Sequence, residues 1–272
     1  MEATLECTPL APRTVKSEVA KHVDWTPGQW SGEDTEDSQE DEGDREEAES
    51  LIATDNEAMA SLSEKNKGWQ IIMDWAMKFL QMRYREKQSD WFGKGGLSWD
   101  ISSVISRDAS TGKLQVTSFA HLFDQCTQDS YPVASITEHL LQHLKTKNPS
   151  RESVHLRSDE AGCDSNFLIA AVRDIGQRVG IAVESYDFSE RQRGKDVCDR
   201  ILCPLKSSVR THCSGGHDIL TASDMREALQ KHPVRGATAA ASMVDESKKS
   251  LQLKKIEHFS SFHNFNFEPS GI

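Results

Sequence analysis

The hydrophobic period of this 272-residue sequence changes once, near Ser130, and this change constrains the fold more than any other feature. Before it, residues 71–80 alternate with the period of two that is typical of β-strands, and residues 97–105 and 114–123 are predicted as two further strands. Their connections are short, which predicts an antiparallel meander of three sequential strands. After it, helical spacing and short apolar runs follow one another.

The second half of this pattern predicts alternating helices and strands. A helix begins at Ser130, the expected cap, and ends before Asn148. Further along, residues 154–157 and 181–186 have the pattern of strands, and helices are expected from about Ser165 and about Lys195. Three antiparallel strands followed by helix, strand, helix, strand and helix is the element order of the ribonuclease-H-like fold. We therefore predict an α/β protein with a mixed five-stranded sheet flanked by helices.

The charge of the chain is concentrated in one segment. Residues 33–49 hold eleven Asp and Glu against one Arg, about −10 of the net charge of −11. Residues 1–66 are poor in large apolar side chains, so we expect a disordered acidic region that acts as an interaction tail or as a solubilising linker. Residues 67–244 form the expected ribonuclease-H-like core, and residues 245–272 form a poorly organised tail. Because the core is close to neutral, the acidic total does not exclude a DNA partner.

Several functional classes are excluded by missing motifs. The six cysteines form no CxxC pair, which favours a reducing compartment. No apolar run reaches membrane-spanning length, and the N-terminus lacks the apolar run of a secretory signal. The GxSxG and HExxH motifs and a convincing Cys/His pair are absent, which suits metal-ion chemistry that requires no protein nucleophile.

Three aspartates fall where the ribonuclease-H-like fold holds its acidic residues. Asp74 lies in the middle of the first strand, Asp159 ends the fourth strand, and Asp199 or Asp196 lies on the helix after the fifth. Two Mg²⁺ or Mn²⁺ ions held by such carboxylates promote in-line displacement at phosphorus. Each aspartate also has a structural alternative: a helix cap for Asp159, an ordinary strand residue for Asp74 and a solvated helix residue for Asp199.

A basic stretch surrounds the last of these helices. It consists of Arg191, Arg193, Lys195, Arg200 and Lys206. These side chains are either phosphate contacts beside the metal ions or a solvated helix face.

Four runs of residues resemble DDE/D transposases, a group of transposon-derived proteins. They are DWAMKFL from residue 74, QSDWFGKGGLSW from residue 88, LRSDEAGC from residue 156 and GKDVCDRILCPLK from residue 194. By position, the resemblance implies metal ligation by Asp74, Asp159 and Asp199, with Asp196 as the alternate. The chain departs from the pattern at Glu160, where Asn is expected. No recognisable zinc finger or other DNA-binding motif is found before the expected core, and a truncated C-terminal end is expected.

The resemblance implies a metal-dependent DNA nuclease and strand transferase. Its expected partner is double-stranded DNA at transposon ends. A homo-oligomer is compatible with it, and the expected location is the nucleus, otherwise the cytoplasm, with no membrane contact. The sequence is also compatible with a partial or inactive copy, or with a non-catalytic domesticated interaction or DNA-binding protein. A third interpretation, a ribonuclease-H-like exonuclease, requires a further acidic pair or a late histidine.

Overall fold

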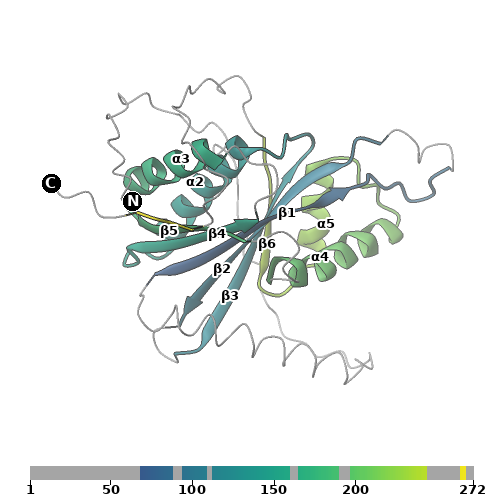
Figure 1. Ribbon diagram of the computed structural model, residues 1–272. Helices are drawn as coiled ribbons and strands as arrows, with labels where there is room; N and C mark the ends of the chain where they lie inside the picture. The colour runs from purple at the N-terminus through teal and green to yellow at the C-terminus, as the bar shows by residue number, and fades with distance from the viewer. Residues whose placement is uncertain are drawn as a thin grey trace.

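The structure of the chain, a computed structural model, describes residues 68–87, 94–108, 112–159, 165–189, 197–243 and 264–267 (Figure 1). The strands are β1 (Trp69–Phe79), β2 (Leu97–Arg107), β3 (Leu114–Phe123), β4 (Ser153–Asp159), β5 (Ala182–Ser189), β6 (Ala237–Ala241) and β7 (Asn264–Asn266). The helices are α2 (Ser130–Lys147), α3 (Ser165–Val179), α4 (Val197–Ser214) and α5 (Ala222–Lys231). The expected acidic region, residues 1–66, lies outside the described residues, and so does most of the expected tail.

The strand order of the sheet is β6-β3-β2-β1-β4-β5-β7. β1, β2 and β3 pair antiparallel, whereas β1, β4 and β5 pair parallel. The five middle strands therefore have the order 3-2-1-4-5 of the ribonuclease-H-like fold, which confirms the predicted fold class. The sheet has seven strands rather than five, because β6 adds to β3 in parallel and β7 adds to β5 antiparallel. Both additions are short, so the hydrophobic period of the sequence does not reveal them.

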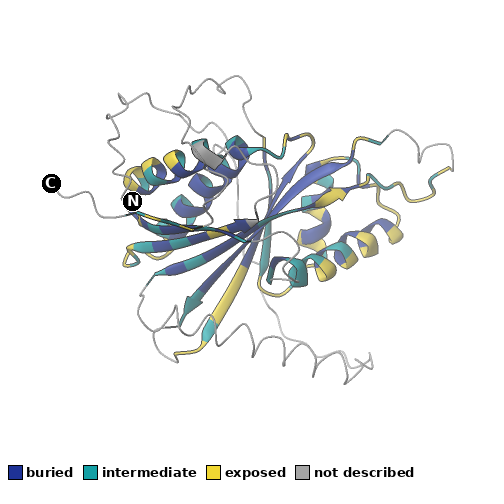
Figure 2. Ribbon diagram, viewed as in Figure 1, coloured by how far each residue is buried: buried dark blue, intermediate teal, exposed yellow. Residues whose placement is uncertain are grey.

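The helices cover the sheet in two layers. Helices α2 and α3 pack on one face, and α4 and α5 pack on the other, over β1, β2, β3 and β6 (Figure 1). Each layer encloses its own apolar core, and Figure 2 shows the buried residues gathered along the middle strands. No helix within the described part of the chain is long and apolar enough to cross a membrane.

β1 changes face near its end. The alternation in the sequence predicts one apolar face that includes Met77 and Phe79. The register with β2 shifts between Ala76 and Phe79, however, so Phe79 joins Ile72 and Ala76 in the core beneath α4 and α5. Met77 is 84% exposed. This part of the prediction is wrong because a bulge adds a residue and resets the alternation.

The structure tests two predicted starts and ends of elements. The cap of α2 is Asp129, whose carboxylate accepts from the Tyr131 backbone N–H, and not Ser130. β4 runs to Asp159, which confirms that Asp159 ends the fourth strand, although the apolar pattern of residues 154–157 stops two residues earlier. Pro204 lies inside α4, which continues past it as a single helix.

Gly176 sets the distance between α3 and β5. A Cβ atom at this position would lie 2.6 Å from the Ile181 carbonyl oxygen and 2.8 Å from Val183 Cγ2. Carbon atoms do not approach other atoms this closely without displacement, so the helix approaches the strand only because residue 176 has no side chain.

We expect the Gly176→Ala substitution to destabilise the fold by about 1–3 kcal/mol, because the added methyl group must push α3 off β5. In an unconstrained helix, the same change stabilises by about 1 kcal/mol. Urea unfolding measures the difference. Gly95→Ala is the matched control, since its Cβ meets nothing within 4 Å. A Gly176→Ala protein as stable as the wild type would show that the close approach is absent.

Candidate active site

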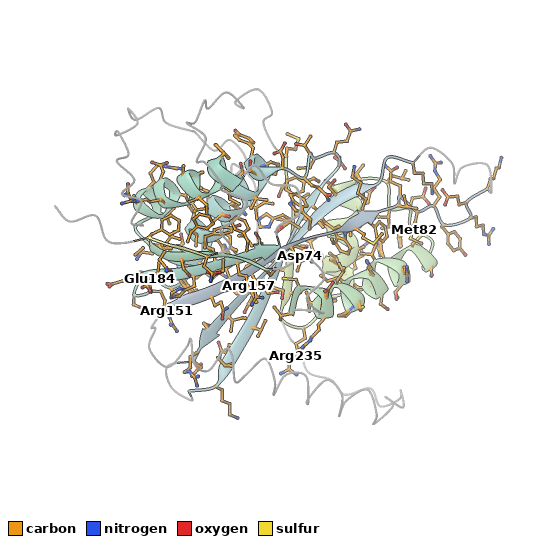
Figure 3. The ribbon with its side chains drawn as sticks, viewed as in Figure 1. Asp74, Met82, Arg151, Arg157, Glu184 and Arg235 are labelled. Atoms are coloured by element: carbon orange, nitrogen blue, oxygen red, sulfur yellow. The ribbon has the colours of Figure 1, made fainter. Side chains whose placement is uncertain are left out.

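Asp74 lies in the middle of β1, the central strand of the sheet. It is half-buried, and its partner across the β1–β2 pair is Ile101. Residues opposite one another in a strand pair share a face, and Ile101 belongs to the core beneath α4. Asp74 therefore faces the α4 side of the sheet, near its middle (Figure 3).

Asp159 is brought next to Asp74 by strand register. β1 and β4 run parallel, and their last paired residues are Met73 and Ser158. Asp74 and Asp159 are the next residue on each strand, so their backbones lie side by side, about 5 Å apart. Asp159 also pairs with Ser189 of β5. Its side chain is outside the described part of the structure.

The start of α4 is fixed against the same strands. The thiol of Cys198 is buried and lies 3.3 Å from the Ile72 carbonyl oxygen and 3.4 Å from that of Ile101. Ile101 is the strand partner of Asp74, so these contacts hold the first turn of α4 over the centre of β1 and β2. Asp199 follows Cys198 directly and is half-buried. The structure thus brings Asp74, Asp159 and the first turn of α4 to one region of the sheet.

The remaining predicted site residues divide into two groups. Arg200 and Lys206 lie on α4 and are half-buried. The others, Asp196, Arg191, Arg193 and Lys195, lie outside the described residues. Among the described side chains, no three His, Cys, Asp or Glu groups converge as a metal site. Because the Asp159 side chain is not among them, the predicted ligand set stays a prediction.

A row of polar residues crosses the other face of the sheet. Trp75, Asp100 and His121 are successive partners on β1, β2 and β3. Asp100 and His121 are each 1% exposed. Ser102 Oγ donates to Asp100 Oδ1 at 2.8 Å, and His121 Nε2 lies 2.9 Å from Nδ1 of His139 on α2.

Burial sets the charge of this row. It raises the pKa of Asp100 to about 7, against the hydrogen bond from Ser102, and the charge of Asp74 adds to the rise. The negative field of the candidate site therefore reaches through the sheet. Burial and neighbouring imidazoles lower the pKa of His121 well below its usual value and that of His139 to about 4. Both histidines are neutral at neutral pH.

Sequence reasoning missed Asp100, His121 and His139. Asp100 and His121 carry the same signal as Asp74, a titratable residue within an otherwise apolar strand, whereas His139 lies on α2 and carries no such signal.

Comparison with known proteins identifies a family but no activity. The model of a family described as a domain of unknown function (DUF8701) matches residues 57–269, so the chain belongs to this family. No curated protein matches the chain. A solved structure described as a human cytomegalovirus terminase nuclease domain, Mn-soaked and inhibitor-bound, has 11% sequence identity and a TM-score of 0.28. The similarity covers 56% of this chain and 62% of that domain, less than two thirds of its length. The fold assignment rests on strand order and register, not on this likeness.

We expect Asp100→Asn to stabilise the protein by about 2–4 kcal/mol at pH 8, because the wild type must then bury an ionised carboxylate. In the wild type, the folded state holds a proton at Asp100 that the unfolded state loses above its pKa of 3.8. Stability from this group therefore falls as pH rises from 3.8 to about 7. The asparagine oxygen still accepts from Ser102.

Urea midpoints of both proteins at pH 3.5, 6 and 8 measure this effect. The advantage of Asp100→Asn should vanish near pH 3.5, where Asp100 is protonated in both states. The histidine contributions occur in both proteins and cancel in the difference. A difference that does not change with pH would contradict the raised pKa of Asp100.

Proposed function

We propose that this member of the DUF8701 family is a metal-dependent DNA nuclease and strand transferase of the DDE/D type. Asp74, Asp159 and Asp199 would be its metal ligands, with Asp196 as the alternate for the third. The single observation that carries the proposal is the register of β1 and β4, in which Asp74 and Asp159 directly follow the pair Met73 and Ser158. Adjacent carboxylates at the middle of a sheet repel one another, and a divalent cation is the usual means of neutralising them.

The type of ligand favours Mg²⁺ or Mn²⁺. Carboxylate oxygens are hard ligands, which these ions prefer, and thiol or imidazole groups are not part of the proposed set. Two such ions, when bound, activate the attacking oxygen and stabilise the leaving oxygen of a phosphodiester. The half-buried position of Asp74 on the central strand gives a fixed backbone from which to hold a cation.

Cys198 supports the third position. Its contacts with the carbonyl oxygens of Ile72 and Ile101 hold the start of α4 against the strand pair that carries Asp74. Asp199 is one residue away on a helix turn that cannot shift without breaking these contacts. Asp196 lies outside the described residues and stays the alternate.

The wider proposal follows from the resemblance to DDE/D transposases. The protein would act on double-stranded DNA at transposon ends. It would lie in the nucleus and would assemble as a homo-oligomer. The acidic segment, residues 33–49, would lie apart from the DNA, because like charges repel.

We expect Asp159→Asn to reduce metal-dependent nicking of plasmid DNA by about 100-fold or more while leaving the fold intact. Nicking is measured with Mg²⁺ or Mn²⁺ and again after EDTA, and urea unfolding checks the fold. Asp174→Asn is the control, since Asp174 is an exposed residue of α3 paired with Arg178. If the wild-type protein never nicks DNA under these conditions, the nuclease proposal is wrong and the non-catalytic interpretation remains.

The third ligand is assigned by comparing Asp199→Asn with Asp196→Asn. We expect the first to lose activity as fully as Asp159→Asn and the second to retain most of it, because residue 199 directly follows Cys198, whose contacts hold the start of α4. Measuring how the residual nicking activity of each variant depends on metal concentration gives a second measure of which aspartate is the ligand. The reverse result would make Asp196 the ligand.

A further inference from the structure

One part of the sheet has no described helix on the α4 side. The core beneath α4 and α5 contains no described residue of β4 or β5. The apolar side chains of these two strands, among them Val154, Leu156 and Tyr186, belong to the core on the α2 and α3 side. The alternate positions, His155 and Arg157 on β4, therefore lie on a polar strip that continues the face of Asp74.

His155 is fixed within this strip by two contacts. Its Nδ1 lies 2.9 Å from Ser185 Oγ, and its Nε2 lies 3.1 Å from Glu184 Oε2. Glu184 and Ser185 are consecutive on β5, where the register shift opposite Val154 and His155 turns both toward the strip. Both ring nitrogens are thus engaged, and the imidazole is held close to the sheet.

Arg157 differs from His155 because it is exposed and its one described interaction is the charge attraction to Asp187. It forms no hydrogen bond or ion pair with the described residues. It is also the one Arg or Lys among the described residues of β4 and β5. Its partner across the strand pair is Asp187, whose pKa is raised by burial and lowered by the charges of His155 and Arg157. The five N–H donors of the guanidinium are therefore available to a ligand.

The position of Arg157 relates it to the candidate site. Arg157 pairs with Ile72 of β1, two residues before Asp74, and it lies two residues before Asp159 on its own strand. Two residues along a strand span about 6.6 Å, and both positions share one face. The guanidinium is long enough to reach a phosphate next to one held at Asp74 and Asp159. Figure 3 shows Arg157 and Asp74 labelled near the middle of the sheet.

We propose that Arg157 binds a backbone phosphate of the DNA strand, next to the phosphate at which Asp74 and Asp159 act. This inference rests on the proposed function and adds the path of the substrate, which runs from the aspartates over β4 toward β5. A guanidinium binds phosphate oxygens through two parallel N–H donors and reads no base, so the contact holds the strand without selecting a sequence. Asp187 competes with the phosphate for Arg157, and its charge keeps the free side chain over the sheet.

The experiment measures DNA binding by fluorescence anisotropy with the full chain carrying Asp159→Asn, which binds without cutting. The probe is a fluorescein-labelled 30-base-pair duplex in Mg²⁺ at increasing KCl. We expect Arg157→Ala to weaken binding about 5- to 20-fold and to lower the salt slope by about one. The loss should be equal for duplexes of unrelated sequence. Arg157→Lys should keep the slope.

Two further variants make the test specific. Asp187→Asn should tighten DNA binding, because it removes the competing carboxylate. Arg157→Ala and Asp187→Asn should therefore change the affinity for DNA in opposite directions. Arg235→Ala should leave affinity unchanged, because this exposed residue lies before β6 at the other edge of the sheet. Thermal unfolding confirms that each variant is folded.

The outcomes separate this inference from the proposed function. Unchanged affinity and slope in Arg157→Ala would overturn the inference and leave the nuclease proposal standing. Tighter DNA binding by Arg157→Ala would also overturn it and would point to the acidic segment, residues 33–49, as the occupant of the strip. A parent protein that binds no DNA would overturn both. If binding depends on Arg157 but the wild-type protein never nicks DNA with Mg²⁺ or Mn²⁺, the inference about Arg157 is supported and the nuclease proposal is overturned.

Discussion

The parallel pairing of β1 with β4 is the interaction on which the rest of the structure depends. β1 has an antiparallel partner on one side and a parallel partner on the other, so it joins the meander to the helix-connected half of the sheet. A parallel partner requires a crossover, and α2 provides it on the face that α3 also covers. The same register brings Asp74 and Asp159 together, so the fold and the candidate site depend on one set of backbone hydrogen bonds.

The two faces of the middle strands have different polar groups. On the α4 side, Asp74 lies among apolar neighbours beside the helix start that Cys198 fixes. On the α2 side, Asp100 and His121 are buried in a row where burial favours the neutral form of each. Because burial raises the pKa of Asp100 to about 7, this carboxyl keeps its proton below neutral pH and then adds no second negative charge near Asp74.

Much of the fold follows from local pattern in the sequence. The bounds of β3 match the prediction, and α3 ends before Gly180, which has the positive φ of 76° that a glycine adopts without strain. Features that depend on distant partners were not predictable in this way. The run ATAAA of β6 has no apolar alternation, and only its pairing with β3 makes it a strand. The bulge that buries Phe79 is likewise invisible to a strict period of two.

The candidate site was partly predictable for the same reason. Three aspartates could be assigned to strand ends and a helix start, but register is a property of two strands, and it alone makes Asp74 and Asp159 neighbours. Arg157 is exposed because the described part of α4 does not cover β4, and the sequence of β4 does not reveal this. The row that contains Asp100 and His121 becomes apparent only from the pairing of β1, β2 and β3.

The central position of β1 has a consequence for how the protein forms. Trp69 and its partner Val154 are 85 residues apart, whereas β2 begins 18 residues after the last residue of β1. During synthesis, the meander of β1, β2 and β3 emerges long before β4. Contacts across so long a loop form late and slowly, because the chain must be closed before they contribute any stability. The two aspartates therefore become neighbours only after β4 has paired with β1, and a chain that stops before residue 159 lacks the second aspartate.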